Sequence, residues 1–288
     1  MNNYFCGWYF KCQSEKQTLA LIPAVHISGN RRSCSVQLIS NTENWNISLT
    51  PDHAGVRKDR PFAVLEHTVF REDGLYLELH ENSFSATGSL QFSTPSPIRY
   101  DIMGPFRYMP FMECRHSIFS MHHRVNGHLI INGTAHYFQD GDGYIEGDRG
   151  RSFPKHYAWT HCFFPEGSLM LSVAEIPIGP VHFTGVIGII QLGGKEYRLA
   201  TYLGAKAVKI RDGQVTVRQS TLTLTATLLE NTACPLQAPQ NGAMTRIIRE
   251  NAACHARYHL SENGKTILEF ETTAASFEYE YPCRSEIV

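Results

Sequence analysis

Hydrophobic and polar residues alternate with a period of two along most of this chain. The segment Thr221–Leu228 alternates strictly, and Leu75–His80 does so directly after an Asp-Gly turn signal. Because successive side chains of a strand point to opposite faces, this period predicts half-buried β-strands. Only Ala243–Asn251 has the spacing of an amphipathic helix.

The predicted strands are short, numerous and separated by turn residues. Roughly fifteen of them can be placed, and one antiparallel barrel of about eight to ten strands would hold only about half of that number. The sequence therefore predicts an all-β protein with two antiparallel β-barrel or β-sandwich domains and very little helix. We place the division after residue 130, giving an N-terminal domain of residues 1–130 and a C-terminal domain of residues 131–288.

Composition and charge narrow the class of partner. The 288 residues contain 26 Lys and Arg against 27 Asp and Glu, so nothing in the charge favours binding to nucleic acid. No apolar run reaches the length of a membrane span, and the first residues lack the features of a signal peptide. The eight cysteines are scattered without metal-like spacing and are expected to be reduced. We expect a cytoplasmic protein without stable membrane insertion, with peripheral membrane association as the alternative.

The segment 141–162 combines glycines, charges and aromatic residues at an unusual density. Within it, Glu146 and Asp148 are two residues apart, so an extended backbone would place both carboxylates on one face. Paired carboxylates raise the pKa of one member, which is how a general acid stays protonated near neutral pH. Spacing alone favours the simpler interpretation, in which Arg149 and Arg151 neutralise both on a solvated turn. The predicted C-terminal domain would carry this segment.

Several histidines lie near this segment but lack the spacing of metal ligands. His122 and His123 are adjacent and would point to opposite faces of a strand, and no HxH or HExxH motif is present. We therefore predict no metal, and we interpret Glu113, His116 and His122 as a polar lining or proton donors in an apolar cavity. Ordinary core or surface histidines are the alternative. The glycine pattern matches no phosphate-binding loop, and no nucleophile elbow is present, so no cofactor is expected.

A series of short motifs, in order along the chain, resembles the tocopherol cyclase family. The chain is also distantly similar to carotenoid hydratases and the lipocalin-like two-barrel proteins grouped with them. The motifs are Gly7–Lys11, Pro110–Cys114 with His116, Gly143–Glu146 with Asp148, Gly150–Pro154, Trp159, Phe183–Gly185, Gly194–Tyr202, and Ala238–Pro239 with Gly242–Met244.

Two departures from the family pattern fall in the expected pocket. Arg149 stands where the family usually has tryptophan, and Thr160–Phe163 lacks the asparagine usually found close after Trp159. Both changes affect the expected substrate more than the expected fold.

The resemblance implies a lipocalin-like fold and a tocopherol cyclase-like enzyme of the intramolecular lyase or isomerase type. Such an enzyme protonates an alkene in the prenyl tail of a hydrophobic small molecule, and a phenol oxygen captures the cation. Glu146 or Asp148 would be the acid, and Arg151 an orienting charge. The expected substrate-binding residues are Glu113, His116, His122, Tyr144, Phe153, Tyr157, Trp159 and His161. A non-catalytic lipocalin-like carrier of an apolar ligand and a carotenoid-type hydratase are the alternatives.

Overall fold

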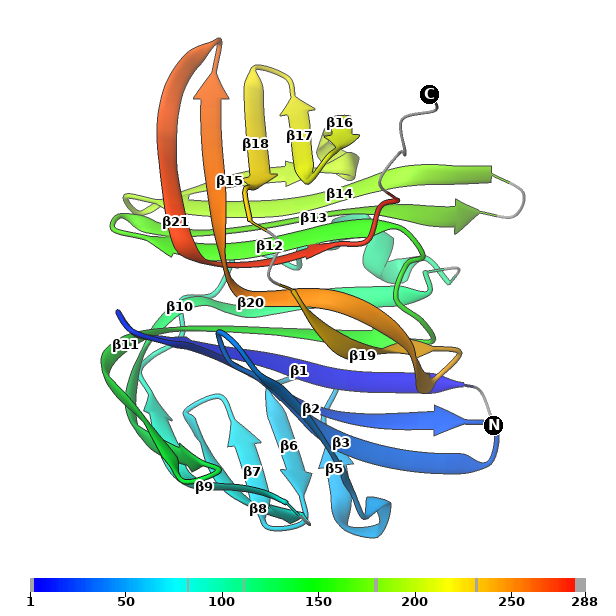
Figure 1. Cartoon of the computed structure of the whole chain (residues 1–288). Helices are drawn as coiled ribbons and strands as arrows, with labels where there is room; N and C mark the ends of the chain where they lie inside the picture. The colour runs from blue at the N-terminus through cyan, green and yellow to red at the C-terminus, as the bar shows by residue number, and fades with distance from the viewer. Residues whose placement is uncertain (1–2, 82, 111, 179–180, 231–232, 283–288) are drawn as a thin grey trace, which may run out of the picture. The chain divides into compact units, whose positions relative to one another are not determined.

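A computed structural model describes residues 3–81, 83–110, 112–178, 181–230 and 233–282. Most of them lie in antiparallel strands, and the helical segments are three short 3-10 turns, η1 (Pro51–His53), η2 (Gly104–Tyr108) and η3 (Thr201–Leu203). Two large sheets account for the strands (Figure 1). This confirms the predicted all-β fold of two lipocalin-like antiparallel domains with very little helix.

The first sheet has 11 strands in the order β4-β3-β2-β1-β11-β10-β9-β8-β7-β6-β5. Neighbours in this order are mostly strands that follow one another in the chain and form hairpins. The exception is the pairing of β1 with β11, which joins the first and the last strand of this sheet. The strands are β1 (Tyr4–Gln13), β2 (Thr18–Ser28), β3 (Arg31–Ile39), β4 (Asn44–Leu49), β5 (Ala54–Val56), β6 (Phe62–Leu65), β7 (Thr68–Arg71), β8 (Gly74–Glu81), β9 (Phe84–Phe92), β10 (Cys114–Ile131) and β11 (Thr134–Gly150).

The second sheet has the order β15-β14-β13-β12-β21-β20-β18-β17-β16, and β19 pairs with β20. Its strands are β12 (Tyr157–Phe164), β13 (Gly167–Ile178), β14 (Val181–Leu192), β15 (Lys195–Ala200), β16 (Lys206–Arg211), β17 (Gln214–Gln219), β18 (Leu222–Leu228), β19 (Cys234–Gln240), β20 (Ala243–Glu262) and β21 (Lys265–Tyr279).

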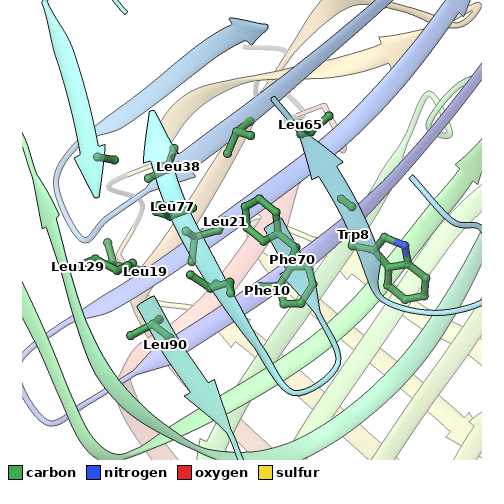
Figure 2. Packing of buried hydrophobic residues seen from close by; sticks show 14 of the residues in the cluster. Trp8, Phe10, Leu19, Leu21, Leu38, Leu65, Phe70, Leu77, Leu90 and Leu129 are labelled. Atoms are coloured by element: carbon green, nitrogen blue, oxygen red, sulfur yellow. The ribbon is translucent and has the colours of Figure 1, made fainter. Parts of the chain in front are cut away.

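The chain divides into two compact units, each with its own hydrophobic core. Unit 1 comprises residues 1–101, 113–153 and 237–247, and unit 2 comprises residues 102–112, 154–236 and 248–288. In unit 1 the rings of Phe10 and Phe70 lie 5.3 Å apart and are surrounded by leucines such as Leu21 (Figure 2). Burial of such a cluster removes a large apolar area from water and supplies the main stabilisation.

The division at residue 130 differs from these units. Residue 130 lies inside the β10–β11 hairpin, whose turn is Asn132–Gly133, so the predicted seam falls within unit 1. The segment 141–150 accordingly belongs to unit 1 and not to a C-terminal domain.

The helix expected over 243–251 is wrong, because these residues form the start of β20. Ile248, Glu250 and Ala252 are buried at every second position, as in a strand, whereas Ile247 is 59% exposed. A glutamate at a buried position hides the period of two in the sequence.

Two other expectations concern the chain as a whole. The seven cysteines within the described ranges are free, as predicted, and Cys283 lies outside those ranges. In the part of the chain that the structure describes, no helix has the length and apolar character needed to cross a membrane.

Candidate functional site

Strand β11 carries two kinds of side chain on its two faces. Ile145 belongs to the core of unit 1, and Gly147 lies under the ring of Trp8, where a Cβ would come within 2.7 Å of the indole. Tyr144, Glu146 and Asp148 alternate with these residues and therefore point to the face opposite the core. The prediction that Glu146 and Asp148 share one face is confirmed by the strand geometry.

His116, on the neighbouring strand β10, lies between these two carboxylates. Its Nε2 atom is 3.1 Å from Oε2 of Glu146, and its Nδ1 atom is 3.1 Å from Oδ1 of Asp148. The pairing of β10 with β11 sets His116 directly opposite Asp148. The side chains of His116, Glu146 and Asp148 are 10%, 6% and 24% exposed, so the three groups interact largely away from water. We call these three residues the acid triad.

Two further side chains contact the acid triad. The Tyr144 hydroxyl donates a 2.5 Å hydrogen bond to Oε2 of Glu146, and the Cys114 thiol donates one of 3.4 Å to Oδ1 of Asp148. Burial, reinforced by Glu146, raises the pKa of Tyr144 well above its usual value. Burial and the charge of Asp148 do the same for the pKa of Cys114. Both groups therefore stay protonated at neutral pH and act as donors to the carboxylates.

The protonation state of His116 follows from two opposing effects. Burial, the largest single contribution, lowers the pKa of His116, but the adjacent Glu146 and Asp148 together raise it well above its ordinary value. Nδ1 of the imidazolium donates a hydrogen bond to Asp148, whereas the 3.1 Å contact of Nε2 with Glu146 is an ion pair without hydrogen-bond geometry. The acid triad thus combines one cation with two carboxylates.

The ligand atoms of His116, Glu146 and Asp148 all lie within 4.8 Å of one another, close enough for one metal ion to reach them. Each ring nitrogen of His116 already contacts a carboxylate oxygen, however, and a metal-bound histidine must be neutral. The contacts fit a proton shared among three side chains, and the predicted absence of a metal stays a prediction.

The predicted arginine partners of the carboxylates are placed differently. Arg151 lies 3.8 Å from Glu113, and its side chain is 60% exposed. The Arg149 guanidinium donates a 2.9 Å hydrogen bond to the Ser117 hydroxyl. The solvated-turn interpretation is therefore wrong, since Glu146 and Asp148 are in a strand and contact His116.

Two other predicted residues of unit 1 lie at its margins. His122 is half-exposed and contacts Asp142 at 2.7 Å. The ring of Phe153 packs edge-on against Phe5, with centroids 5.5 Å apart. Neither contact involves the acid triad.

The remaining predicted residues lie on β12 of unit 2. Tyr157, Trp159 and His161 are buried and share the face opposite the core of that unit, because Ala158 and Cys162 belong to the core. The Tyr157 hydroxyl donates a hydrogen bond to Glu278, and the His161 ring packs edge-on against Phe163 at 4.7 Å.

Sequence reasoning missed two polar residues on the non-core face of unit 1. Lys11 is fully buried on β1 opposite Tyr144, and His26 is 2% exposed on β2. Each is a polar residue within an otherwise apolar or aromatic strand, which is the signal that could have identified it.

No model of a known protein family matches this sequence, and no curated protein sequence matches it. Solved structures with the same fold do exist. An AttH protein of Nitrosomonas europaea superposes with a TM-score of 0.55 at 10% identity, covering 98% of this chain and 93% of that one. Kievitone hydratase from Nectria haematococca gives 0.52 at 9% identity, covering 96% and 89%. CghA, solved with Sch210972, gives 0.56 at 10% identity, covering 96% and 88%. At these identities the likeness shows the fold.

Proposed function

We propose that this chain is an enzyme that adds a proton to a carbon–carbon double bond of an apolar, prenylated substrate. The observation that carries the proposal is His116, largely buried and held at 3.1 Å by two carboxylates. Buried charges that are clustered in this way are typical of sites that store and deliver protons. The tocopherol cyclase-like activity suggested by the sequence is one form of this chemistry.

The acid triad can perform both proton transfers of such a reaction. With His116 as the imidazolium, one further proton converts Asp148 or Glu146 to the carboxylic acid. That acid donates its proton to one alkene carbon, the π electrons form the new C–H bond, and the other carbon becomes a cation. A hydroxyl oxygen then bonds to the cation and returns its proton to the carboxylate, so charge and atoms balance.

The two carboxylates have different surroundings, which suggests different roles. Glu146 is 6% exposed, and its Oε2 atom contacts both Tyr144 and His116. Asp148 is 24% exposed, and its Oδ1 atom contacts Nδ1 of His116 and accepts a hydrogen bond from the Cys114 thiol. We assign Asp148 as the group that meets the substrate, and Glu146 as the group that holds the imidazolium in place.

The nucleophile distinguishes two reactions. An internal phenol would close a ring, as in a cyclase, whereas water would give a tertiary alcohol, as in a hydratase. Partial exposure of Asp148 admits water at the acid, and one protein with this fold is a kievitone hydratase. Hydration is therefore the second candidate.

The proposal is tested by incubating the purified protein with 2-methyl-6-phytylbenzoquinol and a geranylgeranyl analogue, and analysing products by mass spectrometry. A chromanol or a hydrated product is expected, and it should be lost in Asp148→Asn and strongly reduced in Glu146→Gln. Asp140→Asn is the matched control, because Asp140 is an exposed carboxylate on the same strand.

A non-catalytic carrier of an apolar ligand is the rival explanation. It predicts that both substrates are recovered unchanged and that Asp148→Asn binds them as the wild type does. That result would overturn the enzyme proposal.

A further inference from the structure

A continuous row of residues leads from the acid triad across the non-core face of the unit 1 sheet. The strand registers place His116 opposite Asp148, Asp148 opposite Gly7, Gly7 opposite Ala24, and Ala24 opposite Ser35. These five residues, which we call the small-residue row, come from five adjacent strands. Since neighbouring strands lie about 4.8 Å apart, Ser35 is about 14 Å from Asp148 along the row.

The middle of the row holds little side-chain volume. Gly7 has no side chain and Ala24 has one methyl group, and the three atoms nearest to a Cβ added on Gly7 all belong to β2, at 3.0 to 3.7 Å. Gly7 is partly exposed although it lies within a central strand. Phe5 and Tyr9, two positions before and after it, share the same face and supply aromatic surface on either side.

Two buried polar side chains lie at the far end of the row: Ser35, its last member, and His26, two positions after Ala24 on β2. The Nε2 atom of His26 and the Oγ atom of Ser35 have no hydrogen-bond partner among the residues that the structure describes. His26 is 2% exposed and Ser35 is 6% exposed. Both side chains lie on the non-core face, because Val25 and Cys34 between them belong to the core. Buried polar groups are normally paired, so this pair indicates a bound polar group.

The β19–β20 hairpin borders this end of the row within unit 1. The amide of Gln37 donates a 3.0 Å hydrogen bond to the Gln237 carbonyl on one side. On the other side Gly242 approaches the Ile27 carbonyl so closely that an added Cβ would lie within 2.0 Å of its oxygen. The backbone that carries His26 and Ser35 is thus fixed by the β19–β20 hairpin. We call these two residues the polar end of the row.

The polar end is uncharged. Burial lowers the pKa of His26 to about 4, so its imidazole is neutral at pH 7 and offers one donor and one acceptor. A serine hydroxyl likewise donates and accepts. A hydroxyl group matches both, whereas a carboxylate or ammonium group would lose its hydration without a counter-charge.

We infer that His26 and Ser35 bind the uncharged hydroxyl of an elongated apolar molecule whose other end reaches Asp148 along the small-residue row. The assignment of this molecule as the substrate rests on the proposed function, but the binding itself does not. In a molecule held this way the double bond at Asp148 is remote from the anchored hydroxyl, which favours addition of water over ring closure by that same hydroxyl.

The inference is tested by isothermal titration calorimetry with 4-nonylphenol and its methyl ether, 4-nonylanisole, which lacks the hydroxyl donor. We expect the phenol to bind roughly three- to ten-fold more tightly than the ether, as one or two neutral hydrogen bonds allow. His26→Leu and Ser35→Ala should remove this preference while leaving the affinity for the ether unchanged. 4-Nonylbenzoate should bind more weakly than the phenol.

Two outcomes overturn the inference. One is equal binding of the phenol and the ether, or no binding of either, which would mean that water alone occupies the polar end. The other is a preference that survives in His26→Leu and Ser35→Ala. Gly7→Val should lower the affinity for both the phenol and the ether, because the valine side chain would occupy the middle of the row. Asp148→Asn should leave phenol binding intact. If the wild-type protein binds the phenol with the expected preference but turns over neither prenylated substrate, the proposed function fails and this inference stands.

Discussion

Tyr144 donates a 2.5 Å hydrogen bond to Glu146, its neighbour two positions along β11. Both side chains are buried on the same face, so the tyrosine hydroxyl supplies a donor that water would otherwise provide. The contact gives Glu146 a fixed orientation toward His116.

Replacing Tyr144 by phenylalanine tests this relationship. Removing one donor to a buried carboxylate should cost about 1.5 to 3 kcal/mol of unfolding free energy, measured by urea titration. Turnover should fall as well, because Glu146 no longer holds the imidazolium firmly. Tyr137→Phe on the same strand is the control, since Tyr137 is 68% exposed and should be neutral. Equal stability of the two variants would contradict the assignment.

His116→Gln should destabilise the protein in a pH-dependent way. Loss of the imidazolium leaves two buried carboxylates facing an uncharged group, which typically costs about 3 kcal/mol. The pKa of His116 is raised on folding, so its contribution is complete below its ordinary pKa and is lost as the pH rises through the raised value. The stability difference between wild type and variant should therefore shrink at alkaline pH. A difference that stays constant from pH 6 to alkaline pH would contradict an ionised His116.

His26 and His123 should weaken the fold in acid. Burial lowers the pKa of each to about 4 from the ordinary 6.5. The unfolded chain takes up these protons below pH 6.5, whereas the folded chain does not until about pH 4, so stability falls as the pH drops through this range. Each histidine accounts for about 1.4 kcal/mol per pH unit. His26→Leu should flatten the urea-derived profile below pH 6.5, and an unchanged slope would show that His26 is accessible to protons.

Gly147→Ala should test which face of β11 meets the core. A Cβ there would lie 2.7 Å from the Trp8 ring, and overpacking of this kind costs about 1 to 3 kcal/mol. Gly55→Ala, where an added Cβ meets nothing within 4 Å, is the matched control and should be neutral in the same thermal unfolding assay. A neutral Gly147→Ala would mean that β11 has the opposite orientation.

Divalent metal ions should not stabilise the protein if the acid triad holds a proton. We expect the melting temperature to be unchanged by added Zn²⁺ or Mg²⁺. A rise that grows with metal concentration and disappears in His116→Gln would instead identify a metal site.

The shared face of Glu146 and Asp148 could be predicted because it depends only on the local period of a strand. Their partner could not. His116 reaches them through the register of the β10–β11 hairpin, which shifts at three irregularities between Ile118 and Gly127. The nearest charges in the sequence, Arg149 and Arg151, instead contact Ser117 and Glu113.

The polar residues of buried strands were the other source of error. Glu250 at a buried position of β20 disrupted the apparent period and produced the false helix. His26 does not disturb the pattern of β2, because its apolar neighbours predict a strand whether or not the histidine is buried. The strand prediction alone therefore does not show that its side chain is buried. In both cases a polar side chain is buried because of its position in the sheet, which the local pattern of hydrophobic residues does not reveal.

The three-part composition of unit 1 has a consequence for its assembly. Residues 237–247 belong to this unit, and Gln237 pairs with Gln37, 200 positions earlier. A nascent chain emerging from the ribosome cannot complete unit 1 until residues 102–112 and 154–236 of unit 2 have been synthesised. The contacts of the β19–β20 hairpin with the strands that carry His26 and Ser35 are therefore the last contacts of unit 1 that the order of synthesis allows.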